Sequence, residues 1–154
     1  MDLLLWRHAH ARDPEPGETD MNRPLTPKGI RQAENMARWL KRNLPPNTLK
    51  LCSPALRTIQ TMELLSKDYQ LCEYIKPDSS VESLIAASHW PSAPTAVLLV
   101  SHQPLLSEAV CQLLGWPLDF TLPFRKGAVW WIRSLHSAPV PDVQLLTVQD
   151  PEVL

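Results

Sequence analysis

Two polar pairs in this 154-residue chain each come directly after an apolar run. Arg7-His8 lies near the N-terminus, and Ser101-His102 lies far downstream. Continuous apolar runs are typical of strands buried on both faces, and ligands of open α/β sheets bind beyond the carboxyl ends of such strands. Two imidazoles and a guanidinium at that edge predict a phosphate site, in which one neutral imidazole can act as a nucleophile.

A third segment has the same construction. Ser53-Pro54 follows a short apolar run and is typical of a helix start, with Ser as the N-cap and Pro at the first helical position. Arg57 then lies in the first helical turn, where its charge opposes the helix dipole unless an anion is nearby. The unpaired backbone N–H groups of such a helix start would contribute to the same anion site.

The elements that must position these residues alternate along the chain. We expect strands over 3–6, 49–52, 72–75, 95–100, 128–132 and 143–148, and helices that start at Thr26-Pro27, Ser53-Pro54, Ser80 and Pro104. The last two strands should pair at a sheet edge, with one of the rings of Trp130 and Trp131 buried. This order predicts an α/β fold, a three-layer α/β/α sandwich with a mostly parallel sheet. The length fits one domain over residues 1–154.

Composition excludes several classes of partner. The net charge is −1, which does not suggest a nucleic-acid or membrane-surface binder. No segment approaches the roughly 18 consecutive apolar residues of a membrane span, and the N-terminal apolar run is too short for a signal peptide. The three cysteines are odd in number and lack metal-type spacing, so we expect reduced thiols in a cytoplasmic protein. A monomer without nucleic-acid or membrane partners is expected.

The chain resembles the histidine phosphatase superfamily, whose fold is phosphoglycerate mutase-like. Four segments in the same order carry this resemblance: Arg7-His8, the run Arg23-Pro24-Leu25-Thr26-Pro27-Lys28-Gly29, Arg57 within the segment 53–61, and Ser101-His102-Gln103-Pro104. The short length, and Ala9 where many members have Gly, are similar to the small SixA-type phosphohistidine phosphatase branch.

The resemblance implies a role for each of these residues. His8 would be the nucleophile that transiently carries the phosphoryl group, while Arg7, Arg57 and His102 would bind the phosphate. These roles agree with the chemistry, because phosphoryl transfer needs in-line positioning and charge stabilisation above all. His8 must be neutral to attack, and His102 would serve best as a protonated donor once phosphate raises its pKa. Neither a metal nor an organic cofactor is implied.

A metal site is the main alternative for the first pair. His8 and His10 are two residues apart and would face the same way on a strand, as metal ligands can. Barrel hydrolases that use such a pair typically need about 250 residues, more than this chain has. We therefore expect His10 at the rim of the phosphate site, where it can touch the substrate.

The general acid is not evident from the sequence. Glu82 is the best positional match to the acid of larger relatives, and Glu18 and Asp20 are alternatives, Asp20 also as a rim residue. A phosphohistidine can release neutral imidazole without strong acid help, whereas a phosphate ester cannot release an alkoxide so easily. A site without an evident acid therefore suits N–P bonds better than O–P bonds. The family resemblance and the short length imply a phosphohistidine on a protein, such as a phosphotransfer domain of a signalling relay, as the substrate. A small phosphate ester, such as a sugar or nucleotide phosphate, and a non-catalytic phosphate-binding module on the same fold are the alternatives.

Overall fold

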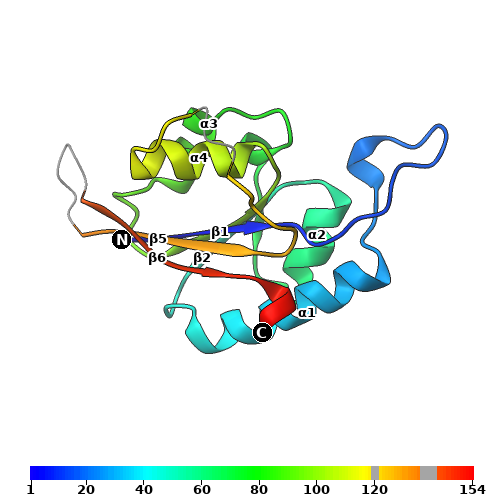
Figure 1. Cartoon of the computed structure of the whole chain (residues 1–154), viewed down its shortest axis with the longest axis horizontal. Helices are drawn as coiled ribbons and strands as arrows, with labels where there is room; N and C mark the ends of the chain where they lie inside the picture. The colour runs from blue at the N-terminus through cyan, green and yellow to red at the C-terminus, as the bar shows by residue number, and fades with distance from the viewer. Residues whose placement is uncertain (119–121, 136–141) are drawn as a thin grey trace.

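A computed structural model describes residues 1–118, 122–135 and 142–154, in which a six-stranded sheet forms the centre (Figure 1). The strands are β1 (Asp2–Arg7), β2 (Leu49–Cys52), β3 (Gln70–Leu71), β4 (Val97–Ser101), β5 (Val129–Ser134) and β6 (Val143–Gln149). Their order across the sheet is β3-β2-β4-β1-β5-β6. The first four are parallel, and β5 and β6 join as antiparallel strands, so the predicted edge pair is confirmed.

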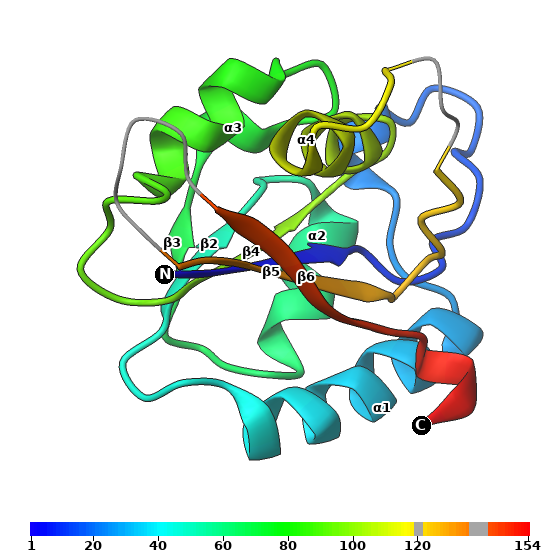
Figure 2. The same cartoon turned by 60° about the vertical axis from the view of Figure 1, so that its left-hand side comes forward.

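Helices cover both faces of the sheet. The helices are α1 (Pro27–Asn43), α2 (Leu56–Glu63), α3 (Val81–Ser88) and α4 (Leu105–Leu114), with short 3-10 turns η1 (Asp20–Asn22), η2 (Glu73–Ile75) and η3 (Pro151–Val153). Figures 1 and 2 show α1 and α2 on one side of the sheet and α3 and α4 on the other. This is the predicted three-layer sandwich. Among the described residues, no helix is both long enough and apolar enough to span a membrane.

Side chains that alternate along the strands fill two separate cores. Leu3 and Leu5 of β1 pack in the layer with α3 and α4, whereas Leu4 and Trp6 pack in the layer with α1 and α2. Trp130 and Trp131 follow the same alternation, and both rings are buried, on opposite faces of β5. The expectation of one buried ring was wrong because both faces of β5 are covered: Trp130 packs against Phe124 and Trp116, and Trp131 packs against Trp39 of α1.

Three helix starts match the sequence patterns and one does not. Thr26 caps α1 through its hydroxyl, Ser80 caps α3 in the same way, and α4 begins just after Pro104. The second helix begins at Leu56 rather than at Ser53-Pro54, and Ala55 is its N-cap. The predicted strand over 72–75 is also wrong, since β3 ends at Leu71 and a 3-10 turn follows.

The strand order brings the predicted polar pairs together. β4 lies between β1 and β2, with Arg7 opposite Ser101 and Cys52 opposite Val100. The main chain keeps this register just past the strand ends, because His8 N donates to Ser101 O and Ser53 N donates to Val100 O, each at 3.1 Å. Three chain segments far apart in sequence therefore leave the sheet side by side.

Candidate active site

A cavity of about 330 Å³ lies beyond the carboxyl ends of β1, β2 and β4. The residues that line it are Arg7, His8, Ala11, Asp20, Arg23, Arg57, Pro77, His102, Gln103 and Lys126. The four residues predicted to handle phosphate are all among them. The cavity also holds more positive than negative side chains, with Asp20 as its one carboxylate.

His8 is held with a free ring nitrogen. Its Nδ1 lies 2.8 Å from the Ala9 carbonyl oxygen, so Nδ1 carries the proton and donates it, which leaves the Nε2 lone pair unprotonated. The ring is buried and lies 5.3 Å from the His102 ring, centroid to centroid. Burial lowers the pKa of His8 well below its usual range, and the positive charges of Arg57 and Arg7 act in the same direction. The expected neutral imidazole is therefore the stable form.

The segment after His8 is fixed by the helices beneath it. Ala9 N donates to Thr61 Oγ1 of α2, and His10 N donates to Gln32 Oε1 of α1. At Gly29 in the first turn of α1, a Cβ would lie 2.0 Å from the His10 carbonyl oxygen, so only glycine allows this approach. The main chain at His8 is thus positioned by two helices.

His102 is a neutral acceptor in this structure. Arg57 Nη2 lies 3.2 Å from His102 Nδ1, and because a guanidinium only donates, Nδ1 must accept. The proton therefore sits on Nε2, which donates to Ser53 Oγ at 2.7 Å. Burial, followed by the charge of Arg57, lowers the pKa of His102 to about 3. The protonated donor expected from the sequence would require a phosphate in the cavity to reverse this shift.

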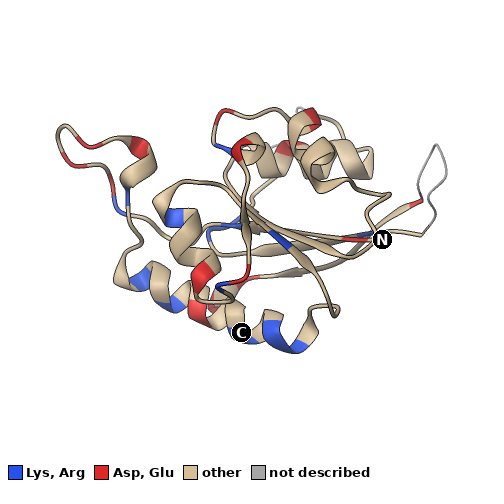
Figure 3. Ribbon diagram, turned by 180° about the vertical axis from the view of Figure 1, so that it is seen from behind, with Lys and Arg blue, Asp and Glu red and all other residues tan. Residues whose placement is uncertain are grey.

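Asp20 lies across the mouth of the cavity and holds two arginines. Arg57 donates to its carbonyl oxygen at 2.7 Å and to its carboxylate at 2.9 Å, and Arg23 donates to the other carboxylate oxygen at 2.9 Å. Burial raises the pKa of Asp20, but the two arginines outweigh burial and the net shift is downward. Asp20 is therefore ionised. It belongs to the loop between β1 and α1, which carries charges of both signs (Figure 3).

Arg7 is anchored by the segment that precedes β5. Its Nη1 donates to the Phe124 carbonyl oxygen at 2.5 Å. Gly127 N donates to the carbonyl oxygens of both Arg7 and His8, in a left-handed conformation (φ +76°) that favours glycine. The Nε atoms of Arg7 and Arg57 are buried and have no hydrogen-bond partner. Buried N–H groups without acceptors are uncommon in folded proteins, and both of these guanidinium groups line the cavity.

Two of the candidate acids are not brought to the cavity. Glu82 is exposed in the first turn of α3 and is not among the lining residues. Glu18 binds Arg12 through both carboxylate oxygens, at 2.7 and 2.8 Å, and also stays outside the lining. Of the three carboxylates considered from the sequence, only Asp20 reaches the site.

His10 faces a neighbouring cavity rather than the ring of His8. β1 ends at Arg7, so the two-residue alternation of a strand does not extend to His8 and His10. His10 Nδ1 lies 2.7 Å from Thr26 Oγ1, and the residue lines an adjoining cavity that shares Lys126 with the His8 cavity. Within the described ranges, no group of three or more His, Cys, Asp or Glu side chains could together hold a metal ion.

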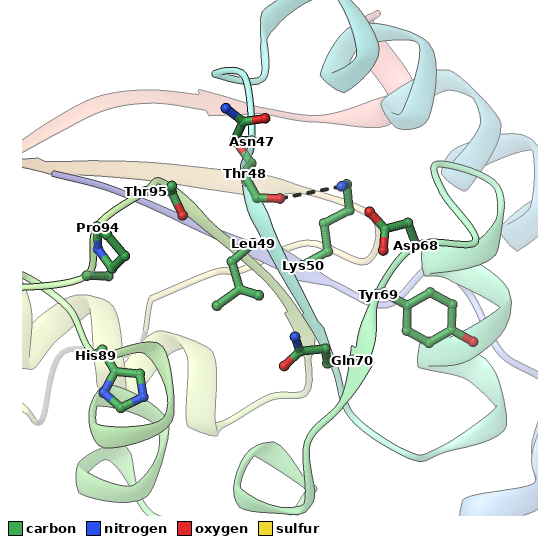
Figure 4. Close-up of a pocket in the computed structure, with 11 residues that line it drawn as sticks. Asn47, Thr48, Leu49, Lys50, Asp68, Tyr69, Gln70, His89, Pro94 and Thr95 are labelled. Atoms are coloured by element: carbon green, nitrogen blue, oxygen red, sulfur yellow. Dashed lines mark hydrogen bonds between the residues drawn. The ribbon is translucent and has the colours of Figure 1, made fainter.

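A hollow of about 430 Å³ at the opposite end of the sheet lacks this chemistry (Figure 4). It lies where β2 begins, and Lys50 there donates to the Thr48 carbonyl oxygen at 3.4 Å. None of the residues predicted for the phosphate site lines it. Volume alone would not identify the functional cavity, whereas the convergence of imidazole and guanidinium groups does.

Three residues of the site were missed in the sequence. The sequence pattern predicts Ser53 as a helix cap, whereas its hydroxyl accepts a hydrogen bond from His102 Nε2. Arg23 lies within one of the segments that carry the family resemblance, and this was the available signal for it. Lys126 lies in an irregular segment before β5, where no pattern in a single sequence points to it.

Comparisons with known proteins agree with this geometry. The sequence profile of the histidine phosphatase superfamily (branch 1) matches residues 3–80. A Haemophilus influenzae protein named phosphohistidine phosphatase SixA homolog is 31% identical over 131 residues, covering 75% of this chain and 78% of its own. The structure of the protein histidine phosphatase SixA complexed with tungstate has a TM-score of 0.82 and covers 99% of both chains at 24% identity. A phosphoserine phosphatase from Entamoeba histolytica, in complex with 3-phosphoglyceric acid, has a TM-score of 0.71 and covers 97% of this chain and 96% of its own at 17% identity, which shows a shared fold.

Proposed function

The chain belongs to the histidine phosphatase superfamily, and we propose that it dephosphorylates phosphohistidine on a signalling phosphotransfer protein. The observation that carries the proposal is the unprotonated Nε2 of His8 in a cavity lined by Arg7, Arg57 and His102. The proposed reaction proceeds through a phosphorylated His8 and uses guanidinium groups, rather than a metal ion or an organic cofactor, to stabilise charge. The relative named as a SixA homolog supports this substrate class.

In the first step, the Nε2 lone pair of His8 attacks phosphorus and the P–N bond of the substrate breaks. The electron pair of that bond goes to the substrate nitrogen, which leaves as neutral imidazole if its other ring nitrogen is protonated. The proton of His8 stays on Nδ1, and its hydrogen bond to the Ala9 carbonyl oxygen stabilises the ring as it gains positive charge. Arg7 and Arg57 neutralise charge on the phosphoryl oxygens, which is the main requirement of this transfer.

In the second step, water attacks the phosphorylated His8 and releases inorganic phosphate. His8 leaves as the same neutral tautomer that the Ala9 carbonyl favours, so this step also needs no strong acid. Asp20 lies in the cavity as a carboxylate and is suited to accept a proton from the attacking water. An ionised Asp20 is correspondingly poor at protonating an ester oxygen, which favours N–P over O–P substrates.

Mapping of the covalent intermediate tests the nucleophile. After brief incubation with a radiolabelled phosphohistidine protein and an alkaline quench, we expect an acid-labile, alkali-stable label on His8. His8→Ala should abolish both the label and turnover of an aryl phosphate. His89→Asn is the matched control, because His89 is exposed, lies outside the cavity and has a left-handed conformation that Asn tolerates. Unchanged turnover in His8→Ala would remove His8 from its role.

A small phosphate ester remains the second candidate, because Asp20 places one carboxylate in the cavity. Asp20→Asn separates the two substrate classes. If phosphohistidine is the substrate, the variant should lose at most about tenfold in the single-turnover rate of His8 phosphorylation, since the leaving imidazole needs little help, while the later attack of water slows more. A loss of a hundredfold or more in that phosphorylation rate would instead assign Asp20 as an essential acid. Glu82→Gln, measured on both substrates, should change neither rate because Glu82 is not in the cavity lining.

A further inference from the structure

Two lysines beside the His8 cavity have no carboxylate partner among the residues that the structure describes. Lys126 lines both the His8 cavity and an adjoining cavity of about 410 Å³, and Lys28 lines only the adjoining one. Neither lysine takes part in a salt bridge or hydrogen bond in the part of the chain that the structure describes. The two cavities share Lys126 as a lining residue, so a ligand held at His8 lies beside the cavity that Lys28 lines.

The acidic residues of the adjoining cavity already have partners. Asp150 binds Arg125 at 2.8 Å and also accepts from the backbone N–H of Glu152. The side chain of Glu152 accepts from Gln32 Nε2 at 2.8 Å. His10 lines the same space, with its Nδ1 against Thr26. These pairings leave the ammonium groups of Lys28 and Lys126 as the cations available to a ligand.

The lysines also repel one another and the arginines of the site. Burial lowers the pKa of Lys126, and the charges of Arg7, Arg23 and Lys28 lower it further against a smaller opposing effect of Asp13. Lys28 lies in the first turn of α1, which has no acidic residue to offset it. An incoming anion would relieve this accumulation of positive charge, whereas a neutral ligand would not.

We infer that Lys28 and Lys126 bind an acidic side chain of the substrate, a carboxylate that lies close to the phosphorylated residue. This inference rests on the proposed function, since it places the phosphoryl group at His8. Lys28 is exposed on α1, so a side chain on the surface of a partner protein can reach it without entering a closed pocket. The two lysines would lower KM for substrates that carry such a carboxylate. The groups of the His8 cavity would still determine kcat and bind the transferred phosphoryl group.

Two series of probes test the inference. The first compares inhibition by alkylphosphonates with inhibition by carboxyalkylphosphonates of the same chain lengths. We expect one length of the carboxylate series to bind about twofold to fivefold more tightly, the range expected for one exposed charge pair. The second compares phosphohistidine peptides with Glu or Gln near the phosphorylated residue, and the Glu peptide should have the lower KM at equal kcat. Lys28→Gln should remove both gains, and Lys28→Arg should retain them.

Arg31→Gln is the matched control, because Arg31 is an exposed cation on the same helix that lines neither cavity. It should leave both gains in place, and Lys126→Gln should reduce them. If simple alkylphosphonates bind but no carboxylate adds affinity, or if Arg31→Gln acts like Lys28→Gln, the second subsite is refuted and the proposed function stands. If only the inhibitors and not the peptides show the gain, the carboxylate belongs to a small molecule and the protein side chain is refuted. If simple alkylphosphonates do not bind at all, both proposals fail.

Discussion

Replacement of Ser53 by Ala should damage both stability and catalysis. The Ser53 hydroxyl is fully buried and accepts a hydrogen bond from His102 Nε2, with 2.7 Å between Oγ and Nε2. Without it, a buried N–H loses its partner, which costs about 1–3 kcal/mol. The same loss would free the His102 ring to turn away from Arg57 and the phosphate. If the transition state loses about 1.4–2.7 kcal/mol of stabilisation as a result, kcat/KM drops by about 10-fold to 100-fold.

Ser101 provides a matched control at the end of the adjacent strand. It is also fully buried and makes one hydroxyl hydrogen bond, of 2.8 Å, to the Ile75 carbonyl oxygen rather than to a side chain of the cavity. Ser53→Ala and Ser101→Ala should therefore lose similar free energies of unfolding in urea titrations. Only Ser53→Ala should lose activity on an aryl phosphate. Equal losses of activity in the two variants, or unchanged kcat/KM in Ser53→Ala, would refute this account of His102.

Two further predictions concern the stability of the fold at low pH and the close contact between α1 and the segment after His8. His102 has a pKa near 6.5 in the unfolded chain and a pKa of about 3 in the folded protein. Between these two pH values the unfolded state therefore binds one more proton than the folded state. The free energy of unfolding should therefore fall as the pH drops from 6.5 toward 3, by up to about 1.4 kcal/mol per pH unit, and urea titrations of His102→Asn should show a shallower slope. Gly29→Ala should destabilise the fold by about 1–3 kcal/mol, because its Cβ would meet the His10 carbonyl at 2.0 Å. Thermal unfolding measures that loss, and an unchanged melting temperature would contradict it.

Local patterns in the sequence were sufficient for the elements whose signals are strong. The apolar runs before His8 and His102 and the Thr26-Pro27 start identified two strands and a helix correctly. They also located the site, because parallel strands that end in polar residues deliver them to one edge. Both tryptophans of β5 were harder to place, since the burial of a strand's two faces depends on which segments pack on each face of the sheet.

Local sequence patterns could not predict the hydrogen-bond partners of the candidate catalytic groups. A Ser-Pro pair is read as a helix cap by propensity, but the hydroxyl of Ser53 meets an imidazole that comes from residue 102. Glu82 matched a position in larger relatives, yet α3 leaves it exposed and outside the cavity. Asp20 lies in a long loop, and the conformation of that loop brings it to Arg57. The periodicity of a sequence does not predict the conformation of such a loop. These contacts depend on tertiary packing between segments distant in the chain.

The place of β4 between β1 and β2 also has a consequence for protein synthesis. Residues 1–96 contain Arg7, His8 and Arg57 but not β4, the strand that lies between β1 and β2. We therefore expect a nascent chain to assemble the His8 cavity only after the stretch ending at His102 has emerged from the ribosome and β4 has paired with both neighbours.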